Sequence, residues 1–509
     1  GEAPRKQLQA EFQLSSEIGQ LDIRGIASDA SGTVAIEGKL NEGEFRATLQ
    51  PFKLTGNIPT QALSLPDNWV TWMRLGEVVP IHLDTAETTH ITSPAPGSWS
   101  VRVGNALLSL GEKDSTLSAR KLDLEVTALD TEQLEFSSAL SASLNIHLRK
   151  QTFPTLEIEF AQHGGLQKSG FELRVADSAR SLHTDLKGTL DLTSGRGTYQ
   201  LTAQVTDLPS FWAKTAPLLR HFGVLNSSVE LRSGSIRLHT DIQSKSFDTS
   251  TWEQRSRLAI KDTAGSLDDL HFEGLALSAD WSGIARWKTL QPLVLSLATF
   301  NPGFAIKDIE LQVSLPKATA VARPQMRVDA FSAELFGGRL ILPAAQAWDF
   351  AAPSNSITLQ AKQWQLGELV ALQQNAEIQA QGTLEGELPL TISDGRIIID
   401  KGYLRALPPG GSIRYTPTDG NRALARHNPD LELALDLLSD FQYQVLSSEV
   451  SLDKSGNLLL GLSLAGSNPT LYEGQAVNFN INVEQKIDPL LQTLQLSDNL
   501  LERIETGLK

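Results

Sequence analysis

Apolar and polar residues alternate with a period of two along most of the chain. Leu122 and Leu124 alternate with Asp123 and Glu125, and many later segments repeat the pattern. This period is typical of β-strands that have one dry face and one wet face. Short turn signals such as Ser-Gly-Arg-Gly at 194–197 separate the runs. We therefore expect antiparallel hairpins, because parallel strands would need crossover helices.

The alternation predicts a mainly β fold. We expect a long, curled antiparallel sheet that forms an extended hydrophobic groove, with a few short amphipathic helices and a C-terminal helix. Apolar residues at helical spacing favour short helices near 209–224, 364–372 and 431–441 and a longer one over 488–508.

The segment 209–224 has two interpretations that the sequence leaves open. It is either a helix that packs against a bend of the sheet or a lid over the groove, and apolar stripes more often mark packing. The residues that would form the lid are Phe211, Trp212, Leu218 and Phe222.

A sheet with one apolar face must bury that face against a second sheet, a layer of helices or a ligand. The predicted helices are too few to cover it. Aromatic residues make up only 6% of the chain, and the inward residues are mainly aliphatic, which favours a groove filled by acyl chains. Tandem β-sandwiches in a structural or adhesive protein remain the alternative. The apolar residues that we expect to line the groove are Leu122, Leu124, Leu144, Ile146, Leu156, Ile158, Phe171, Leu173, Leu190, Leu192, Ile236, Leu238, Leu275, Leu277, Leu460 and Leu462.

Composition narrows the possible functions. The 509 residues carry a formal net charge of −15, and no basic cluster stands out, so a nucleic-acid partner is disfavoured. The chain has no cysteine, which excludes disulfides, zinc-thiolate sites and cysteine nucleophiles.

No arrangement of residues predicts catalysis or metal binding. The nine histidines are scattered, without the spacing of a helical metal site. The segments 163–165 and 453–457 are better explained as turns than as an oxyanion loop or a calcium loop. We therefore expect no enzyme activity, no catalytic residue, no metal and no cofactor.

Several motifs in the last third of the chain resemble a known family. Residues 331–340, Phe-Ser-Ala-Glu-Leu-Phe-Gly-Gly-Arg-Leu, resemble a strand-turn-strand element of AsmA-like proteins from Gram-negative bacteria. Further segments occur in the order found in the C-terminal region of the YdbH members of this family: 382–390, 394–396, 402–404, 409–415, 464–469 and 477–483. Upstream only the strand periodicity agrees. The expected divisions are a first β-groove region at 1–330, a family-like β-groove region at 331–487 and an amphipathic helix at 488–509.

The resemblance implies a bridge-like lipid transfer protein with a repeating β-groove. Such proteins are linked to glycerophospholipid transport between the inner and outer membranes, and hence to outer-membrane lipid homeostasis, with bound phospholipid as cargo. The resemblance also implies a periplasmic location and an anchor in the inner membrane through an N-terminal helix. We expect this chain to be the periplasmic portion, without that anchor. The implied partner at the C-terminal end is the small outer-membrane lipoprotein YnbE.

The last clear strand, at 477–483, is a candidate for contact with that partner. An open sheet ends in an unpaired strand, which can accept a strand from another chain. The edge residues would be Val477, Phe479, Ile481 and Val483. A strand covered by the 488–508 helix is the alternative, because proteins often cover their edges.

Overall fold

The structure is a computed structural model of the chain. It describes residues 9–486 except for the intervals 18–19, 30–31, 42–43, 60–77, 95–96, 113–114, 131–134, 149–150, 153, 222–227, 269, 284–287, 303, 316–324, 350–351, 372–376, 394–395, 419–421 and 423–428. The helix expected at 488–509 lies outside the described residues.

The prediction of a mainly β protein is confirmed. Strands hold 72% of the described residues, neighbouring strands are antiparallel, and the sheet that the described strands form is not closed. The residues form two compact units, which we call unit 1 (1–226 and 235–256) and unit 2 (227–234 and 257–509). The boundary expected after residue 330 falls inside a strand of unit 2, β22 (Gln325–Leu335).

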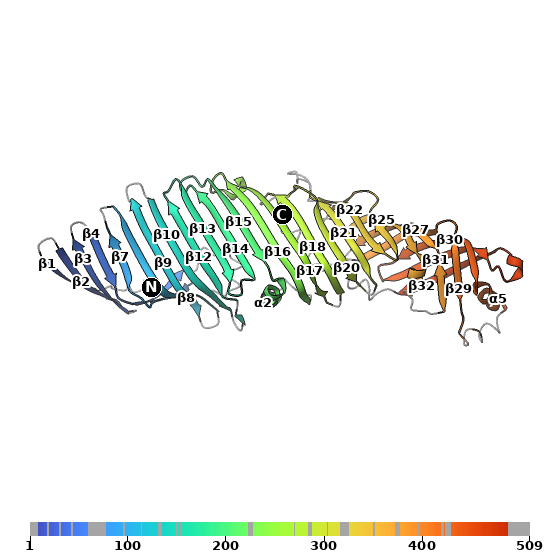
Figure 1. Cartoon of the computed structure of the whole chain (residues 1–509), viewed down its shortest axis with the longest axis horizontal. Coiled ribbons are helices and arrows are strands. Elements are labelled where there is room, and N and C mark those ends of the chain that lie inside the picture. The colour runs from blue at the N-terminus through green and yellow to red at the C-terminus, as the bar shows by residue number, and fades with distance from the viewer. Residues whose placement is uncertain are drawn as a thin grey trace, which may run out of the picture. The chain divides into compact units, whose positions relative to one another are not determined.

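The described part of unit 1 is a succession of strands with the α-helix α2 (Figure 1). Its elements are β1 (Gln9–Glu17), β2 (Gln20–Asp29), β3 (Gly32–Asn41), β4 (Glu44–Leu49), β5 (Lys53–Pro59), β6 (Val78–Thr85), β7 (Thr89–Ser93), β8 (Trp99–Glu112), β9 (Ser115–Asp130), β10 (Glu135–Leu148), β11 (Gln151–Thr152), β12 (Leu156–Gly164), β13 (Ser169–Asp177), β14 (Leu182–Leu190), β15 (Gly197–Val205) and helix α2 (Leu208–His221). Strands β16 (Val229–Ser244) and β17 (Glu253–Leu267), with the short 3-10 helix Thr249–Thr251 between them, contribute residues to both units.

From β8 onwards the main strands of unit 1 follow a simple meander. Each pairs with the next along the chain, from β8–β9 to β15–β16, and the two-residue strand β11 adds to the end of β10. Before this meander, β7 pairs with one half of β8 and β6 pairs with the other half. Directly paired residues share a face of the sheet, so this register decides which side chains lie together.

β-Bulges interrupt the alternation at particular residues. Asn105 and Lys121 have positive φ values of 48° and 53°, and the register shifts beside them. A bulge adds one residue to one strand, so the apolar side chains change from odd to even positions there. Thus Leu117 and Leu122 lie on the same side of β9 although their numbers differ in parity.

The described part of unit 2 continues with strands and the short α-helices α3 and α5. These are β18 (Leu270–Ser282), β19 (Lys288–Thr289), β20 (Leu293–Asn301), β21 (Ile306–Ser314), β22 (Gln325–Leu335), β23 (Gly338–Ile341), β24 (Gln346–Asp349), β25 (Ser354–Gln365), α3 (Leu366–Ala371), β26 (Ile378–Gln381), β27 (Thr383–Ser393), β28 (Arg396–Ala406), β29 (Gly411–Tyr415), α5 (Pro429–Leu438), β30 (Phe441–Leu452), β31 (Asn457–Ser467), the 3-10 helix Tyr472–Gly474 and β32 (Val477–Lys486). Helices α2, α3 and α5 overlap the three short segments where the sequence predicts helices, and α3 lies wholly inside its segment.

Unit 2 contains a closed apolar core between β22 and β31. We call it the closed cluster: Leu335, Ala361, Trp364, Leu384, Leu388, Leu404, Phe441, Tyr443, Leu446, Val450 and Leu464, each no more than 8% exposed. The rings of Phe336 and Trp364 meet edge to face at 5.0 Å, a favoured aromatic geometry. Protein side chains from several strands therefore fill this part of unit 2.

Candidate functional site

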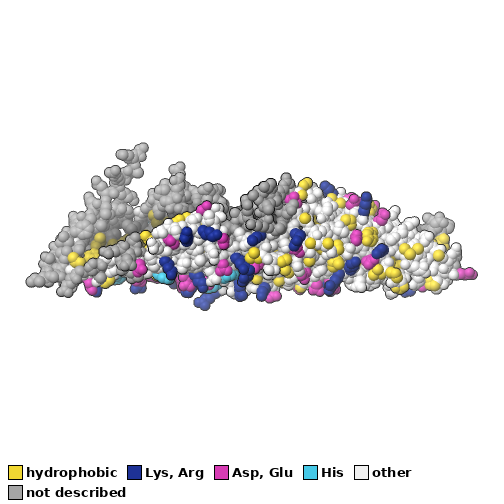
Figure 2. Space-filling view, turned by 90° about the horizontal axis from the view of Figure 1, so that it is seen from above, with side chains coloured by type: hydrophobic (Ala, Val, Ile, Leu, Met, Phe, Trp, Pro, Cys, Tyr) yellow, Lys and Arg dark blue, Asp and Glu magenta, His cyan; other side chains and the backbone are white. Residues whose placement is uncertain are grey.

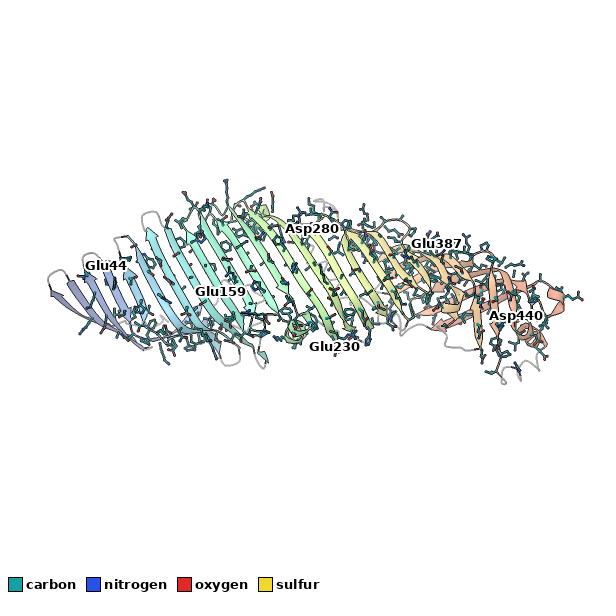
Figure 3. The ribbon with its side chains drawn as sticks, viewed as in Figure 1. Glu44, Glu159, Glu230, Asp280, Glu387 and Asp440 are labelled. Carbon is teal, nitrogen blue, oxygen red and sulfur yellow. The ribbon has the colours of Figure 1, made fainter. Side chains whose placement is uncertain are left out.

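A continuous apolar row crosses unit 1 from strand to strand. Val103 pairs with Leu124, Leu124 with Leu140, and Leu140 with Phe160. The row continues in register through Leu173, Leu186 and Leu201, on β13, β14 and β15. These side chains are all partly exposed. We call the side of unit 1 that carries this row the apolar face. Figure 3 shows the described side chains along the strands.

The apolar face extends beyond this row. A parallel row on one side carries Leu122, Ala142 and Ile158. In the row on the other side, Val126 and Phe171 are separated in register by the polar residues Ser138 and Gln162. The groove candidates that lie on the apolar face of unit 1 are Leu122, Leu124, Leu144, Leu156, Ile158, Phe171, Leu173, Leu190, Ile236 and Leu238. The backbone of Ile146 lies in β10, but its side chain is outside the described part of the structure. Leu192 lies beyond the end of β14, in a turn, and is 39% exposed.

Little protein covers the apolar face in the described part of unit 1. The buried cluster there consists of Ala106, Leu122 and Ala142, whereas the closed cluster of unit 2 has eleven buried members. Partly exposed aliphatic side chains in a continuous row form an apolar surface of the kind that soluble proteins usually cover. The apolar face is therefore the candidate site.

The groove candidates of unit 2 lie in two different settings. Leu277 pairs with Leu295, and Leu275 lies two residues before it on β18; all three are partly exposed. Leu460 instead packs against the closed cluster, and Leu462 pairs with Ile481.

The opposite side of unit 1, the charged face, carries paired ions. Arg174 lies 2.9 Å from Glu172, 3.6 Å from Glu159 and 3.7 Å from Asp185. The hydrogen bond and the charge of Glu172 raise the pKa of Arg174 further above its ordinary value. Charges of both signs are also interspersed over the surface that Figure 2 shows. Exposed pairs of this kind contribute little to stability and keep this side wet.

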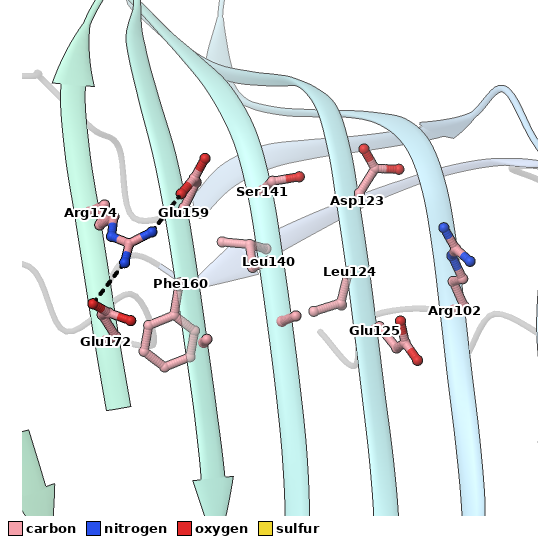
Figure 4. Close-up of a pocket in the computed structure, with 12 residues that line it drawn as sticks. Arg102, Asp123, Leu124, Glu125, Leu140, Ser141, Glu159, Phe160, Glu172 and Arg174 are labelled. Atoms are coloured by element: carbon pink, nitrogen blue, oxygen red, sulfur yellow. Dashed lines mark hydrogen bonds and ion pairs between the residues drawn. The ribbon is translucent and has the colours of Figure 1, made fainter. Parts of the chain in front are cut away.

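A hollow of about 260 Å³ lies on the charged face (Figure 4). Its floor includes the small residues Ala139 and Ala161, and its rim carries two arginines and four carboxylates: Arg102, Arg174, Asp123, Glu125, Glu159 and Glu172. Two of the carboxylates already pair with Arg174. The rest of the lining is Ser141 and three residues of the apolar row, Leu124, Leu140 and Phe160. Because six charged side chains surround the hollow, it suits water better than an acyl chain.

Helix α2 packs along one end of the strands of unit 1. Leu208 and Ala216 are 4% and 3% exposed, and Lys214 Nζ lies 3.6 Å from Asp177 Oδ2. Of the lid candidates, Phe211 and Trp212 are partly exposed. Leu218 lies in the helix but its side chain is outside the described part, as is all of Phe222.

Asp177 is a carboxylate on the apolar face. It pairs in register with Leu156 and is only 2% exposed. Burial alone would raise the pKa of Asp177, but hydrogen bonds from the Ser181 hydroxyl and the Leu182 N–H, together with Lys214, bring it below its ordinary value. The Asp177 carboxylate is therefore charged at neutral pH. The hydrogen bonds that stabilise its charge come from the protein itself, from Ser181 and Leu182.

The candidate edge strand β32 pairs with β31 over its whole length, and no pairing on its other side occurs among the described strands. Phe479 and Ile481 pack against the closed cluster, on the face that also carries Leu464 and Leu462. Val477 and Val483 share that face and are partly exposed. The side chains of these four residues thus serve the core, while the backbone provides the edge.

No group of three or more His, Asp or Glu residues in the described part of the chain could hold a metal ion. Within the same residues, no helix is long and apolar enough to cross a membrane.

Sequence reasoning missed two features of the site. The buried Asp177 was not singled out, although a turn of small polar residues after an acidic residue is a recognisable signal. The closed cluster was also missed, because alternation alone does not show whether an apolar face meets another protein face.

Comparison with known proteins supports the resemblance seen in the motifs. No curated protein and no solved structure gave a significant match. A family model described as "YdbH-like: Intermembrane phospholipid transport protein YdbH" matches residues 1–509, the whole chain. The match therefore also covers the first two thirds of the chain, where only the strand periodicity had agreed. The chain belongs to the YdbH-like family.

Proposed function

We propose that this chain carries phospholipids between the inner and outer membranes of a Gram-negative envelope, with their acyl chains lying on the apolar face. The observation that carries the proposal is the in-register row from Val103 to Leu201, whose aliphatic side chains stay partly exposed. Acyl chains that cover this surface would remove it from water, which contributes about 25 cal/mol of binding free energy per Å² of apolar area buried. Membership of a family described as intermembrane phospholipid transport proteins supports the choice of ligand.

The mechanism requires no chemistry on the lipid. Contact between acyl chains and Leu, Ile and Val side chains is non-directional, so a lipid can move from row to row without breaking a specific bond. The paired charges of the opposite face keep that side in water. We propose accordingly that the chain is not an enzyme and that phospholipid is its cargo.

The rest of the proposal concerns location and partners. We propose that the chain works in the periplasm, that an N-terminal anchor ties the full-length protein to the inner membrane, and that its transport helps maintain outer-membrane lipids. At β32 we propose strand addition by YnbE, because an unpaired backbone edge can accept a strand. The pairing of β32 with β31 alone among the described strands supports this proposal.

A matched pair of variants tests the lipid proposal. Leu201 on the apolar face and Gln200 on the charged face are neighbours in β15, so Leu201→Asp and Gln200→Asp place the same group on opposite sides. A charge is costly in an acyl layer, so we expect Leu201→Asp to lower the phospholipid that co-purifies, measured by native mass spectrometry, by about tenfold or more. Gln200→Asp should leave it unchanged. Equal lipid in two folded variants would refute the proposal.

A further inference from the structure

The two ends of the unit 1 strands differ in what they present to water. At one end lie three turns, 165–168, 191–196 and 245–252, which we call the aromatic rim. They are contiguous: Leu192 N–H donates to Leu166 O at 2.7 Å, and Ser244 Oγ donates to Gly195 O at 2.8 Å. Gly195 lies so close to the third turn that a Cβ there would be 2.4 Å from the backbone nitrogen of Phe247.

The aromatic rim exposes large apolar side chains beyond the ends of the strands. Leu166 and Leu192 are 37% and 39% exposed, and Phe247 at 61% is the most exposed large apolar residue in the described part of the chain. One such side chain is ordinary, but three on adjoining turns prolong the apolar face towards water.

Just inside these turns, aromatic rings cross the strands. Tyr199 lies 5.8 Å from Phe171 and stacks on Trp252 at 5.7 Å. Their polar atoms point to the rim: Tyr199 Oη lies 3.2 Å from Ser244 Oγ, and Trp252 Nε1 donates to Ser246 O at 2.8 Å. Tyr and Trp with an apolar body and a polar tip gather where acyl chains meet headgroups.

The aromatic rim also carries cations. Lys168 and Arg196 are exposed and form no ion pair with a residue that the structure describes, whereas Lys245 pairs with Glu253 at 2.5 Å. The remaining acids accept hydrogen bonds within their own turns, Asp191 from Thr193 and Ser194, and Asp248 from Ser250. Lys168 and Arg196 are therefore available to a phosphate.

The other end of these strands is built differently. Helix α2 packs there through the buried residues Leu208 and Ala216, and Lys214 is engaged with Asp177. A lipid headgroup would have to displace protein contacts at this end, and it would displace none of them at the aromatic rim.

We propose that phospholipid headgroups travel along the aromatic rim of unit 1, with the phosphate at Lys168 and Arg196 and the glycerol level at Tyr199 and Trp252. This inference rests on the proposed function and adds to it the end of the strands from which the headgroups emerge.

The absence of cysteine permits single-site fluorescent labelling without background. Bimane is placed at Leu192→Cys on the aromatic rim, at Arg180→Cys in the turn at the opposite end, and at Leu201→Cys on the apolar face. Each variant of the 509-residue chain is loaded with phosphatidylcholine that carries a nitroxide either on the headgroup or in the acyl chain. Phe247→Cys serves as a second rim site should Leu192→Cys fail to fold.

We expect the headgroup nitroxide to quench the rim label at least about threefold more than the label at residue 180, and the acyl nitroxide to quench the label at residue 201. Equal quenching at both ends, with quenching retained at 201, would overturn the rim assignment and leave the lipid proposal standing. No acyl quenching at 201 would overturn both.

Charge reversal provides the second arm. Lys168→Glu with Arg196→Glu should weaken loading of phosphatidylglycerol about fivefold or more, given the energy of a basic residue near an anionic lipid surface. The matched control is Arg180→Glu with Lys187→Glu, which changes the charge equally at the opposite end and on the charged face, and should leave loading unchanged. Unchanged loading in the rim variant, or a loss confined to binding of intact phosphatidylglycerol vesicles, would overturn the assignment; the latter would make the rim a membrane-docking surface.

Discussion

Two buried polar side chains, Asn468 in a family-like motif and Tyr443 outside the motifs, connect separate segments of unit 2. Asn468 is completely buried, and its side-chain amide donates to Asp436 O and Leu437 O at the end of α5 while accepting from Thr470. The Tyr443 hydroxyl donates to Gln381 O at 2.8 Å, against Gly382, where a Cβ would lie 1.9 Å from that hydroxyl. These residues satisfy buried polar groups that would otherwise be costly, so their role is structural.

At the same scale, Asp177 makes stability depend on pH. Its pKa is lowered in the folded state, so its contribution is fully present above the unfolded pKa of about 3.9 and is lost as pH falls through the folded value. We expect Asp177→Asn to cost about 1–3 kcal/mol at neutral pH and to flatten the loss of stability below about pH 4.

Urea denaturation at neutral and acidic pH measures both effects. The control is Asp241→Asn, whose carboxylate is 53% exposed on the charged face; its stability should stay close to that of the parent chain. If the stability of Asp177→Asn falls with acidification as steeply as that of the parent chain, Asp177 is not the source of the pH dependence.

At the scale of elements, the sequence left two interpretations of helix α2 open, packing against the sheet and a lid over the groove. The buried Leu208 and Ala216 and the ion pair of Lys214 give the helix fixed contacts with unit 1. Trp212 is only partly buried. These contacts favour packing over the movement that a lid requires.

We expect Ala216→Asp to destabilise unit 1 by about 2–4 kcal/mol, because it buries a charge, and Trp212→Glu to cost less than about 1 kcal/mol. Thermal unfolding and lipid co-purification are measured together. If Trp212→Glu keeps its stability but loses bound lipid, the helix contacts cargo and the lid interpretation replaces packing.

At the scale of the whole molecule, the two units differ in how much of their apolar surface the protein itself buries. Unit 2 buries much of it in the closed cluster, whereas unit 1 leaves a row of aliphatic side chains partly exposed. A second open feature is the backbone edge of β32, which pairs with β31 alone among the described strands. A lipid would cover the apolar row through burial of apolar area. A partner strand would pair with the edge of β32 through backbone hydrogen bonds.

Proline substitutions in β32 test the partner edge. In a strand, successive N–H groups point to opposite sides, so Asn480→Pro or Asn482→Pro removes donors on one side and Ile481→Pro removes a donor on the other. One set of N–H groups faces β31, and the substitutions that remove it should lower the unfolding midpoint. The other set of N–H groups faces outwards. The substitutions that remove it should leave folding intact and abolish binding of a YnbE peptide in a pull-down. Binding retained by every folded variant would argue against strand addition.

The alternation of residues was sufficient to predict the fold class, the antiparallel hairpins and the approximate places of α2, α3 and α5, because strand and helix periods are local properties. It also identified most of the apolar positions on β9, β12 and β13. Within one strand, however, the parity reverses at bulges such as Lys121, where no glycine marks the change.

What the sequence determined by itself was the period of the strands, the wet and dry sides of each run, and the motifs that place the chain in its family. Only the tertiary structure decided which dry side is closed by protein and which stays partly exposed. It alone brought the turns of Leu166, Leu192 and Phe247 together at one rim. The physical reason is that burial and proximity depend on pairings between distant segments, whereas alternation reflects only the preference of each residue for water or for an apolar surrounding.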